Sequence, residues 1–406
     1  MAGDLKPLPN VSEEMERELV RAISLDDGAL FQKLLGQGIS AFHIFRGYEN
    51  EGGDLGTFHK PIAQVIVIKN ALRIASTFFD LQDMQAQFEY KAPVAYAIVF
   101  GTPEMVRLMV DKGFDVNKKR VTQPPLLAAA IKGCLDCCKA LIGSGRCNPY
   151  AKDQHDGPHE DRPLCEAARQ GRLDIVKLIV EFKKDRRTLV RSAIVAAENG
   201  HEEVALYLLD ALDAGRKKGG TEEYPYHIIM VAAEHRLMKI VDRVLAQEPR
   251  TLHLINDHKT PLAMACKNNH IELLEQLIAM GADVHAVEDS RYFVYTGKTF
   301  MACNAEELWD AGYNPAPNAG EMKIAQPLHR QSPSSPLAEA AASGHLGIVK
   351  MLVGLGVDPE TAYIKAPRPG LTMALMFNVP AIELARAHGH AAVVDYLSGV
   401  REAAAH

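Results

Sequence analysis

Apolar residues recur along this chain in pairs of short helical segments. The stretch from Pro336 to Asp358, PLAEAAASGHLGIVKMLVGLGVD, has a first segment with small residues, a Gly-His step at Gly344, and a second segment with apolar residues at helical spacing. Altered copies begin at Pro261 and Pro163. A period of about 33 residues predicts a unit of two helices joined by a tight corner.

A unit of this size cannot bury its apolar face alone, so successive copies are expected to stack into one elongated core. Proline suits the first turn of the first helix because no amide donor is needed there. Glycine at the corners and after the second helix suits the left-handed backbone of a reversing chain. The sequence therefore predicts an all-α stack of helix pairs.

The repeat resembles the ankyrin repeat, through the TPL segment at Thr260–Leu262 and the GAD segment at Gly281–Asp283, twenty residues apart. We call the residue at the proline position of each copy its anchor. Matching anchors fall at Pro93, Pro125, Pro163, Ser192, Ile228, Pro261, Pro336 and Ala381, with a weaker copy at Pro61. The residues eight places later, the corners, are Gly101, Gly133, Gly171, Gly200, Arg236, Asn269, Gly344 and Gly389. The resemblance implies an ankyrin-repeat solenoid of helix-turn-helix units with β-hairpin fingers and a β-hairpin or loop insertion.

We expect a single array over residues 1–406. Its expected parts are an N-terminal cap at 12–40, an insertion at 41–60, repeats at 61–289, an insertion with a degraded repeat at 290–335, and C-terminal repeats with a cap at 336–398. Alternating bulky residues around Gly297 predict a hairpin over 291–302. The segment 304–315, with Trp309, resembles a second helix, and the tail 401–406 is expected to fray.

The family's groove supplies candidate binding residues. In ankyrin arrays the sixth and seventh residues after each anchor face a concave groove, and the fingers flank it. Transferred to this chain, with the aromatic residues of the insertion added, the resemblance nominates Phe100, Lys132, Arg169, Gln170, Asn199, Tyr224, Tyr226, His258, Lys267, Asn268, Tyr292, Tyr295 and Trp309.

Composition narrows the function classes. A net charge of −6 and a pI near 6.3 give no broad basic field, so no nucleic-acid partner is expected. No apolar stretch approaches the roughly 20 residues that cross a bilayer, and no secretory signal opens the chain, which predicts no membrane partner and a place in the cytoplasm or nucleus.

The cysteines and histidines receive structural interpretations. Seven cysteines without paired spacing fit a reducing compartment, and Cys134, Cys137 and Cys138 are assigned to small buried positions rather than to a metal or redox cluster. The histidines that follow corners are expected to make local hydrogen bonds. His155 and His159 lie in an acidic finger, 151–162, which we interpret as a solvated tip. No metal and no cofactor are expected.

Two functions remain open. The favoured one is a non-catalytic scaffold that holds a protein or peptide partner in the groove, because no known catalytic motif occurs. The alternative is a cofactor-independent enzyme of the isomerase or cyclase type, or a small-molecule-binding protein, with the groove lidded by the aromatic insertions. In that case Glu198, Glu234 and His235 are the candidate acid and base groups.

Overall fold

The computed structural model describes residues 11–48, 58–81, 93–117, 123–149, 162–214, 228–254, 259–285, 292–295, 300–303, 335–360, 362–364 and 378–404. The chain divides into two compact units, Met1–Ser192 and Ala193–His406. The division falls within helix α11 (Arg186–Glu198). Each unit is described separately.

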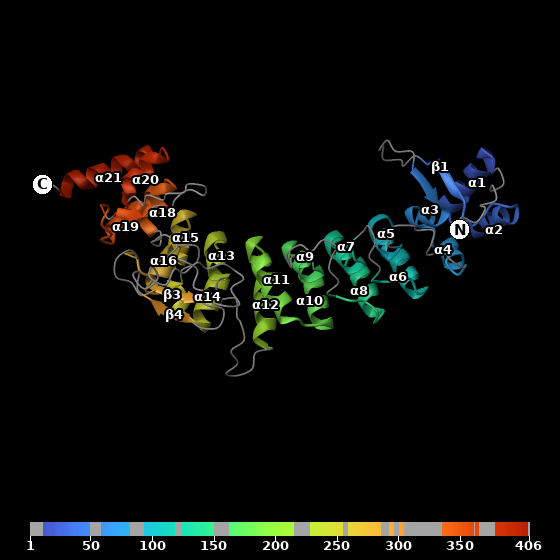
Figure 1. Cartoon of the computed structure of the whole chain (residues 1–406), viewed down its shortest axis with the longest axis horizontal. Helices are drawn as coiled ribbons and strands as arrows, with labels where there is room; N and C mark the ends of the chain where they lie inside the picture. Colours follow the sequence, from blue (N-terminus) through green and yellow to red (C-terminus); the bar gives the residue numbers. More distant parts are fainter. Residues whose placement is uncertain are drawn as a thin grey trace, which may run out of the picture. The chain divides into compact units, whose positions relative to one another are not determined.

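The first unit is built from successive helix pairs, each labelled in Figure 1. Its elements are α1 (Glu13–Ser24), α2 (Gly28–Gly36), β1 (Ile44–Tyr48), β2 (Phe58–Pro61), α3 (Ile62–Ile68), α4 (Leu72–Phe78), α5 (Pro93–Phe100), α6 (Pro103–Asp111), α7 (Pro125–Lys132), α8 (Leu135–Gly143), α9 (Pro163–Arg169) and α10 (Leu173–Phe182).

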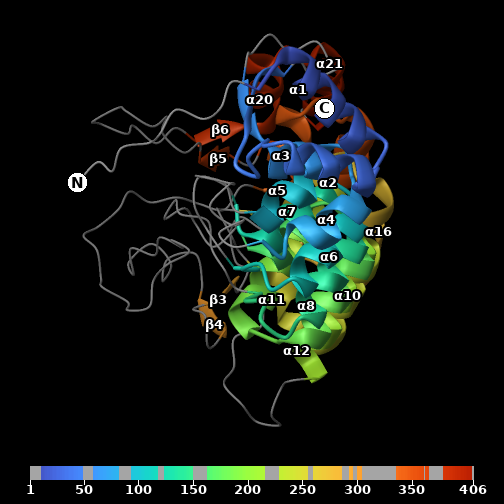
Figure 2. The same ribbon diagram turned by 90° about the vertical axis from the view of Figure 1, so that its right-hand side faces the viewer.

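Helices of like position pack on one another in this unit. The first helices α3, α5, α7 and α9 contact one another in sequence, and the second helices α4, α6, α8 and α10 do the same. Figure 2 shows α3, α5 and α7 as one series, and α4, α6, α8 and α10 as the other. Four buried phenylalanine rings contact one another in series: Phe31, Phe78, Phe79 and Phe114. The Phe78 ring is edge-on to Phe31, at 5.6 Å between ring centroids. A continuous core therefore runs from pair to pair.

The second unit repeats this arrangement. Its elements are α12 (Glu202–Ala214), α13 (Ile228–His235), α14 (Met238–Gln247), the 3₁₀ helix η2 (Pro249–His253), α15 (Pro261–Lys267), α16 (Ile271–Ala279), β3 (Tyr292–Tyr295), β4 (Phe300–Cys303), α18 (Pro336–Ala342), α19 (Leu346–Gly354), β5 (Ala362–Ile364), β6 (Asn378–Pro380), α20 (Ala381–Ala387) and α21 (Ala391–Ala404). Helix α13 packs on α15, α15 on α18, and α18 on α20. Within the described parts of the chain, every helix is too short or too polar to cross a lipid bilayer.

Helices α15 and α18 are direct neighbours although their anchors, Pro261 and Pro336, lie far apart in the sequence. Lys259, just before α15, also forms an ion pair with Glu339 of α18 at 3.6 Å. No repeat therefore stands between these two helices in the stack. Residues 304–334, where the sequence indicates a degraded copy, lie outside the described residues.

The anchors mark the helix starts. Every predicted anchor from Pro93 onward is the first residue of a helix, except Ser192, which lies inside α11. Helix α11 begins earlier, at Arg186, after an Asp185 carboxylate that accepts the Thr188 amide at 3.0 Å. The weaker anchor shifts by one residue, because Pro61 precedes α3 and Ile62 begins it. The all-α stack of helix pairs is confirmed.

The corners adopt the left-handed backbone that the glycines indicate. Positive φ angles occur at Gly133 (70°), Gly171 (68°), Gly200 (76°), Arg236 (57°), Asn269 (58°), Gly344 (79°) and Gly389 (78°). The two N-terminal pairs place Asp26 (52°) and Asn70 (54°) at their corners. Gly101 is the exception. Pro103 follows Thr102 and restricts it to extended backbone, and a Cβ on Gly101 would lie 2.9 Å from the Ala97 carbonyl oxygen.

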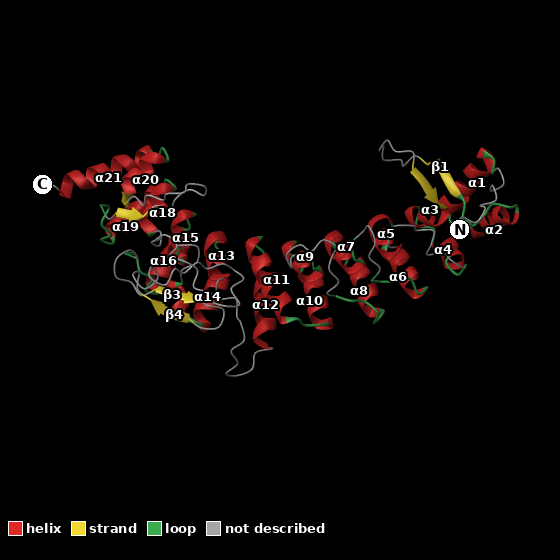
Figure 3. Cartoon of the chain, in the orientation of Figure 1, coloured by secondary structure: helices red, strands yellow, loops and turns green. Residues whose placement is uncertain are grey.

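Three antiparallel strand pairs lie between helix pairs in the described residues, drawn as yellow arrows in Figure 3. The predicted hairpin is confirmed, because Tyr292 pairs with Cys303 and Tyr295 with Phe300. Strands β1 and β2 pair across residues 41–60. The β5–β6 pair was missed, although the 45-residue interval between Pro336 and Ala381 was its signal.

The expectation of a frayed tail is wrong for residues 401–404, which continue α21. Alanine and glutamate are strong helix formers, and the Arg401 Nε atom lies 3.5 Å from a carboxylate oxygen of Glu360.

We predict that Gly344→Ala lowers the free energy of unfolding more than Gly389→Ala. Both positions have the same left-handed backbone, which costs alanine about 1–2 kcal/mol. At Gly344 a Cβ would also lie 2.5 Å from the His390 Nδ1 atom, whereas nothing lies within 4 Å at Gly389. Urea denaturation followed by circular dichroism should give an additional loss of about 1 kcal/mol at Gly344.

The additional loss at Gly344 should disappear in a His390→Ala background, because the ring that obstructs the new methyl group is then absent. Equal losses at Gly344 and Gly389 in the unsubstituted chain would contradict the packing of His390 on this corner.

Candidate interaction surface

The carboxyl ends of the first helices form the surface that the sequence nominates. In the first unit these ends carry the sixth and seventh residues after each anchor, counted for α3 from its first residue, Ile62. We call them the first-helix row: Ile68, Lys69, Val99, Phe100, Ile131, Lys132, Arg169 and Gln170. Val99, Phe100 and Ile131 are exposed, at 54%, 51% and 38%. Large apolar side chains on adjacent repeats therefore face solvent together.

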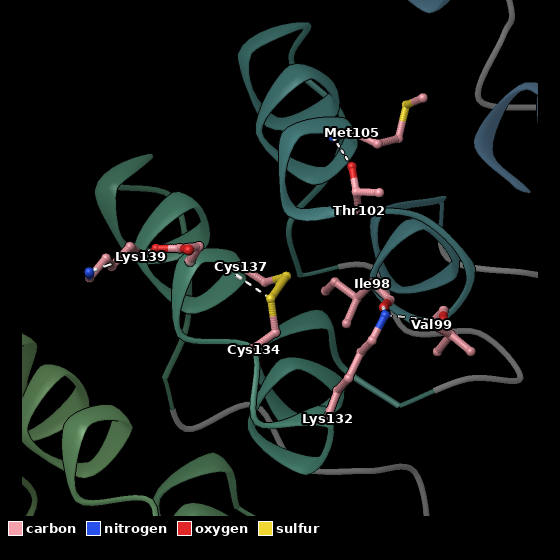
Figure 4. The surroundings of a disulfide bond; sticks show 9 residues. Ile98, Val99, Thr102, Met105, Lys132, Cys134, Cys137 and Lys139 are labelled. Carbon is pink, nitrogen blue, oxygen red and sulfur yellow. Dashed lines mark hydrogen bonds and ion pairs between the residues drawn. A yellow bond between two sulfur atoms is a disulfide. The ribbon is translucent and has the colours of Figure 1, made fainter. Parts of the chain in front are cut away.

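Polar members of the row are engaged in local contacts. The Lys132 ammonium donates hydrogen bonds to the carbonyl oxygens of Ile98 at 2.6 Å and Val99 at 3.3 Å, and so joins α7 to α5 of the preceding repeat, as Figure 4 shows. The Gln170 amide donates to a Glu166 carboxylate oxygen at 2.8 Å, and Arg169 lies 3.6 Å from the same carboxylate group. Lys132 thus links two repeats and is also a candidate contact for a partner.

The equivalent ends of α11, α13 and α15 are polar. Glu198, Glu234 and His235 are exposed, and Lys267 is half-buried. Two side chains at the seventh position bond to their own helices: the Asn199 amide donates to the Val195 carbonyl at 2.8 Å, and the Asn268 amide to the Met264 carbonyl at 3.0 Å. Asn199 and Asn268 therefore complete helix ends.

The candidate acid and base groups do not form a connected site. Glu198 lies on α11, whereas Glu234 and His235 are consecutive residues on α13. In the part of the chain that the structure describes, no hydrogen bond or ion pair joins the side chains of these three residues to one another. A general base is expected within hydrogen-bond reach of its partners, so this geometry offers no support for acid–base chemistry.

Residues that follow corners link successive repeats. The imidazole Nε2 atoms of His270, His345 and His390 lie within 3.0 Å of the carbonyl oxygens of Glu234, Lys267 and Ala342, respectively. Each of these carbonyls is at the sixth position of the preceding repeat. The histidines therefore make hydrogen bonds to the backbone of the neighbouring repeat.

The corners of the N-terminal pairs use other residues for the same purpose. The Asp26 carboxylate accepts the backbone amides of Arg73 at 2.8 Å and Ile74 at 2.9 Å, at the start of α4. The Thr102 hydroxyl donates to the Asn70 side-chain oxygen at 2.8 Å. The sequence comparison missed Asp26 and Asn70 because these corners lack glycine. The sequence did contain a signal for these two corners, because Asp and Asn adopt left-handed backbone more readily than most residues.

One interpretation of the cysteines is wrong. Cys134 and Cys137 are joined by a disulfide at the start of α8, rather than unpaired. Two residues separate them, so one helical turn brings their side chains together. Cys138, Cys147, Cys165 and Cys266 form no disulfide and are buried, as assigned for Cys138. Burial raises the pKa of the Cys138 and Cys147 thiols to about 12, and it also raises the pKa values of Cys165 and Cys266.

A polar cluster before α11 was not anticipated. The Arg162 guanidinium lies 3.2 Å from a carboxylate oxygen of Asp185, and it donates to the Thr188 hydroxyl, which donates to Asp185. Partial burial opposes ionisation of Asp185, but the hydrogen bonds from Thr188 and the charge of Arg162 outweigh it and lower the pKa of Asp185. The cluster fixes the entry to α11.

Several nominated residues cannot be placed. Tyr224, Tyr226, His258 and Trp309 lie outside the described residues, as do His155 and His159. Tyr292 and Tyr295 belong to β3, where only the backbone is described. In the ranges that are described, no three His, Cys, Asp or Glu side chains gather as metal ligands would.

Comparison with known sequences identifies the repeat. A family model of ankyrin repeats in three copies matches residues 62–153 and 128–218, and a model of the single ankyrin repeat matches residues 257–286. This chain is an ankyrin-repeat protein. Ankyrin repeats imply a protein-interaction module, which is the broad class of function to which the chain belongs.

Relatives resemble this ankyrin-repeat protein over part of their length. It is 23% identical over 394 residues to the "Ankyrin repeat and KH domain-containing protein CBG24701" of Caenorhabditis briggsae, covering 86% of this chain and 14% of the relative. Identity is 28% over 200 residues to the mask-1 ankyrin repeat and KH domain protein of Caenorhabditis elegans, covering 48% of this chain and 7% of the relative. The chain thus spans a small fraction of both. The solved human ASB11 ankyrin repeat domain matches with a TM-score of 0.42 and 18% identity, over 67% of this chain and 97% of the domain.

We predict that Lys132→Met lowers the free energy of unfolding by about 1 kcal/mol, because the carbonyls at the end of α5 lose a charged donor. Hydrogen exchange at the backbone of residues 98–101 should become faster. Lys139→Met is the matched control, since Lys139 makes only a surface pair with Asp136 at 3.7 Å and such pairs contribute little. An unchanged hydrogen-exchange rate in Lys132→Met would show that the hydrogen bonds of Lys132 do not stabilise the end of α5.

Proposed function

We propose that this chain is a non-catalytic scaffold that binds a protein partner through the first-helix row of its first unit. The observation that carries the proposal is the exposure of Val99, Phe100 and Ile131 on two adjacent repeats. Exposed apolar side chains that adjoin one another are typical of interaction sites, whereas scattered single ones are ordinary.

The surroundings of the apolar residues support a rigid binding surface. The Phe100 ring packs against Tyr96 with centroids 4.6 Å apart, and Tyr96 is 3% exposed. Lys132 ties the end of α5 to α7. The first contact restrains the Phe100 ring, and the second restrains the end of α5. Because these groups are already ordered before a partner binds, the entropic cost of binding is lower.

The chemistry of the row defines the partner. Apolar side chains at the sixth position of three consecutive pairs, Ile68, Val99 and Ile131, fit a partner segment with apolar side chains at regular intervals. Arg169 follows at the same position of the next repeat, with its charge partly offset by Glu166. We expect the partner to present two or three apolar anchors, followed by a polar or acidic group.

We predict that Val99→Gln combined with Ile131→Gln weakens binding of the partner at least about tenfold, because both lose apolar contact area and neither side chain is part of the buried core. The partner is first captured by a photo-crosslinking amino acid placed at Phe100, and its affinity is then measured by isothermal titration calorimetry.

The matched control is Phe182→Gln, which changes a side chain that is 39% exposed at the end of α10, outside the row. It should leave the affinity unchanged. A partner that binds the double variant as tightly as the unsubstituted chain would rule out this surface.

A further inference from the structure

The Cys134–Cys137 disulfide lies at a position where three other repeats have a linking histidine. Cys134 immediately follows the corner Gly133, as His270, His345 and His390 follow theirs. Those histidines bond to the preceding repeat, whereas in this repeat Lys132 supplies the donor to the preceding α5. Cys134 therefore does not need to make the link that His270, His345 and His390 make at the same position.

The backbone of this corner is the same as at corners without a disulfide. Cys134 has φ −87° and ψ 89°, compared with −81° and 76° at Arg172, −89° and 74° at His270, and −85° and 75° at His345. The corner therefore needs no change of backbone conformation when the disulfide forms or breaks. Reduction should leave the helix pair folded.

The two sulfur atoms differ in access. Cys134 is half-buried, whereas Cys137 is 1% exposed, and Figure 4 shows the pair at the start of α8 with Ile98 and Thr102 of the preceding repeat facing it. The Cys137 amide lies 3.2 Å from the Cys134 Sγ atom, in the way that the Ala338 amide donates to the Ser335 hydroxyl at another helix start. This amide and the helix dipole stabilise negative charge on Cys134, and Asp136, which pairs with Lys139, acts against it.

We propose that Cys134 and Cys137 form a redox-active pair that exchanges reversibly with small thiols such as glutathione. A thiolate attacks the Sγ atom of the half-buried Cys134, forms a mixed disulfide there, and displaces Cys137, which takes up a proton. A second thiol attacks the mixed disulfide, releases Cys134 as a thiol, and leaves as the oxidised small disulfide. Two electrons and two protons pass from the small thiols to the protein.

Four further cysteines are excluded from this exchange by burial. Cys138, next to Cys137 in the chain, is fully buried, and the high pKa of its thiol keeps it from ionising at neutral pH. Cys147, Cys165 and Cys266 are buried as well. The site thus places a reactive pair beside inert thiols in one repeat.

The experiment equilibrates the folded full-length chain with glutathione buffers of graded reduced-to-oxidised ratio, quenches with acid, and labels thiols with N-ethylmaleimide in denaturant. Trypsin cleaves after Lys132 and Lys139, so one peptide, GCLDCCK, contains Cys134, Cys137 and Cys138. We expect this peptide to change from three labels to one in a single two-electron transition. Cys138 should stay labelled throughout, and circular dichroism should stay unchanged.

Two variants and one alkylation rate test the proposal further. Cys134→Ser should abolish the two-thiol transition while preserving a good N-cap residue for α8, and Cys138→Ala should leave the transition unchanged. In the reduced folded chain, iodoacetamide should modify Cys134 at least about tenfold faster than Cys138. The proposal is overturned by three labels in the most oxidising buffer, by a disulfide that resists reduction until the chain unfolds, or by a transition that survives Cys134→Ser.

Discussion

Hydrogen bonding between the corner of one repeat and the first-helix end of the repeat before it is the constraint on which the stack depends. A helix leaves its last carbonyl groups without partners, and burying them unpaired is costly. Here the next repeat supplies the donor, from His270, His345, His390 or Lys132. Each of these four junctions therefore joins a backbone carbonyl of one repeat to a side chain of its neighbour. Stability then accumulates junction by junction.

This constraint also explains which changes of length the chain tolerates. Many residues separate α15 from α18 in the sequence. Even so, His345 bonds to the Lys267 carbonyl at 2.9 Å, and α15 packs on α18. The 45-residue interval before Ala381 likewise leaves the bond from His390 to Ala342 intact. Extra residues enter between helix pairs, where they interrupt no junction, and loop closure costs little per added residue.

Much of the fold follows from the sequence because anchors and corners are local signals. Proline and glycine act through their own backbone, so Pro125, Gly133 and Gly344 could be placed without a structure. Other features depend on distant partners. The early start of α11 relies on Arg162 and Asp185, the Asp26 corner on amides of α4, and the helical tail on Glu360. For the candidate surface, the sequence nominated the row but could not show which of its side chains are already engaged.

Junction geometry divides the row into two series. Polar side chains at the seventh position make hydrogen bonds within the array: Lys132 reaches α5, Gln170 reaches Glu166, and Asn199 and Asn268 reach carbonyls of their own helices. These hydrogen bonds do not depend on which partner is bound. Phe100, at the same position of α5, is exposed instead. At the sixth position, the carbonyl oxygens of Val99, Glu234, Lys267 and Ala342 accept the hydrogen bonds of the junctions, so these bonds leave the side chains of the same residues unused. We therefore expect recognition to depend on the sixth position together with Phe100. The sixth position is apolar at Val99 and Ile131 in the first unit and charged at Glu234 and Lys267 in the second.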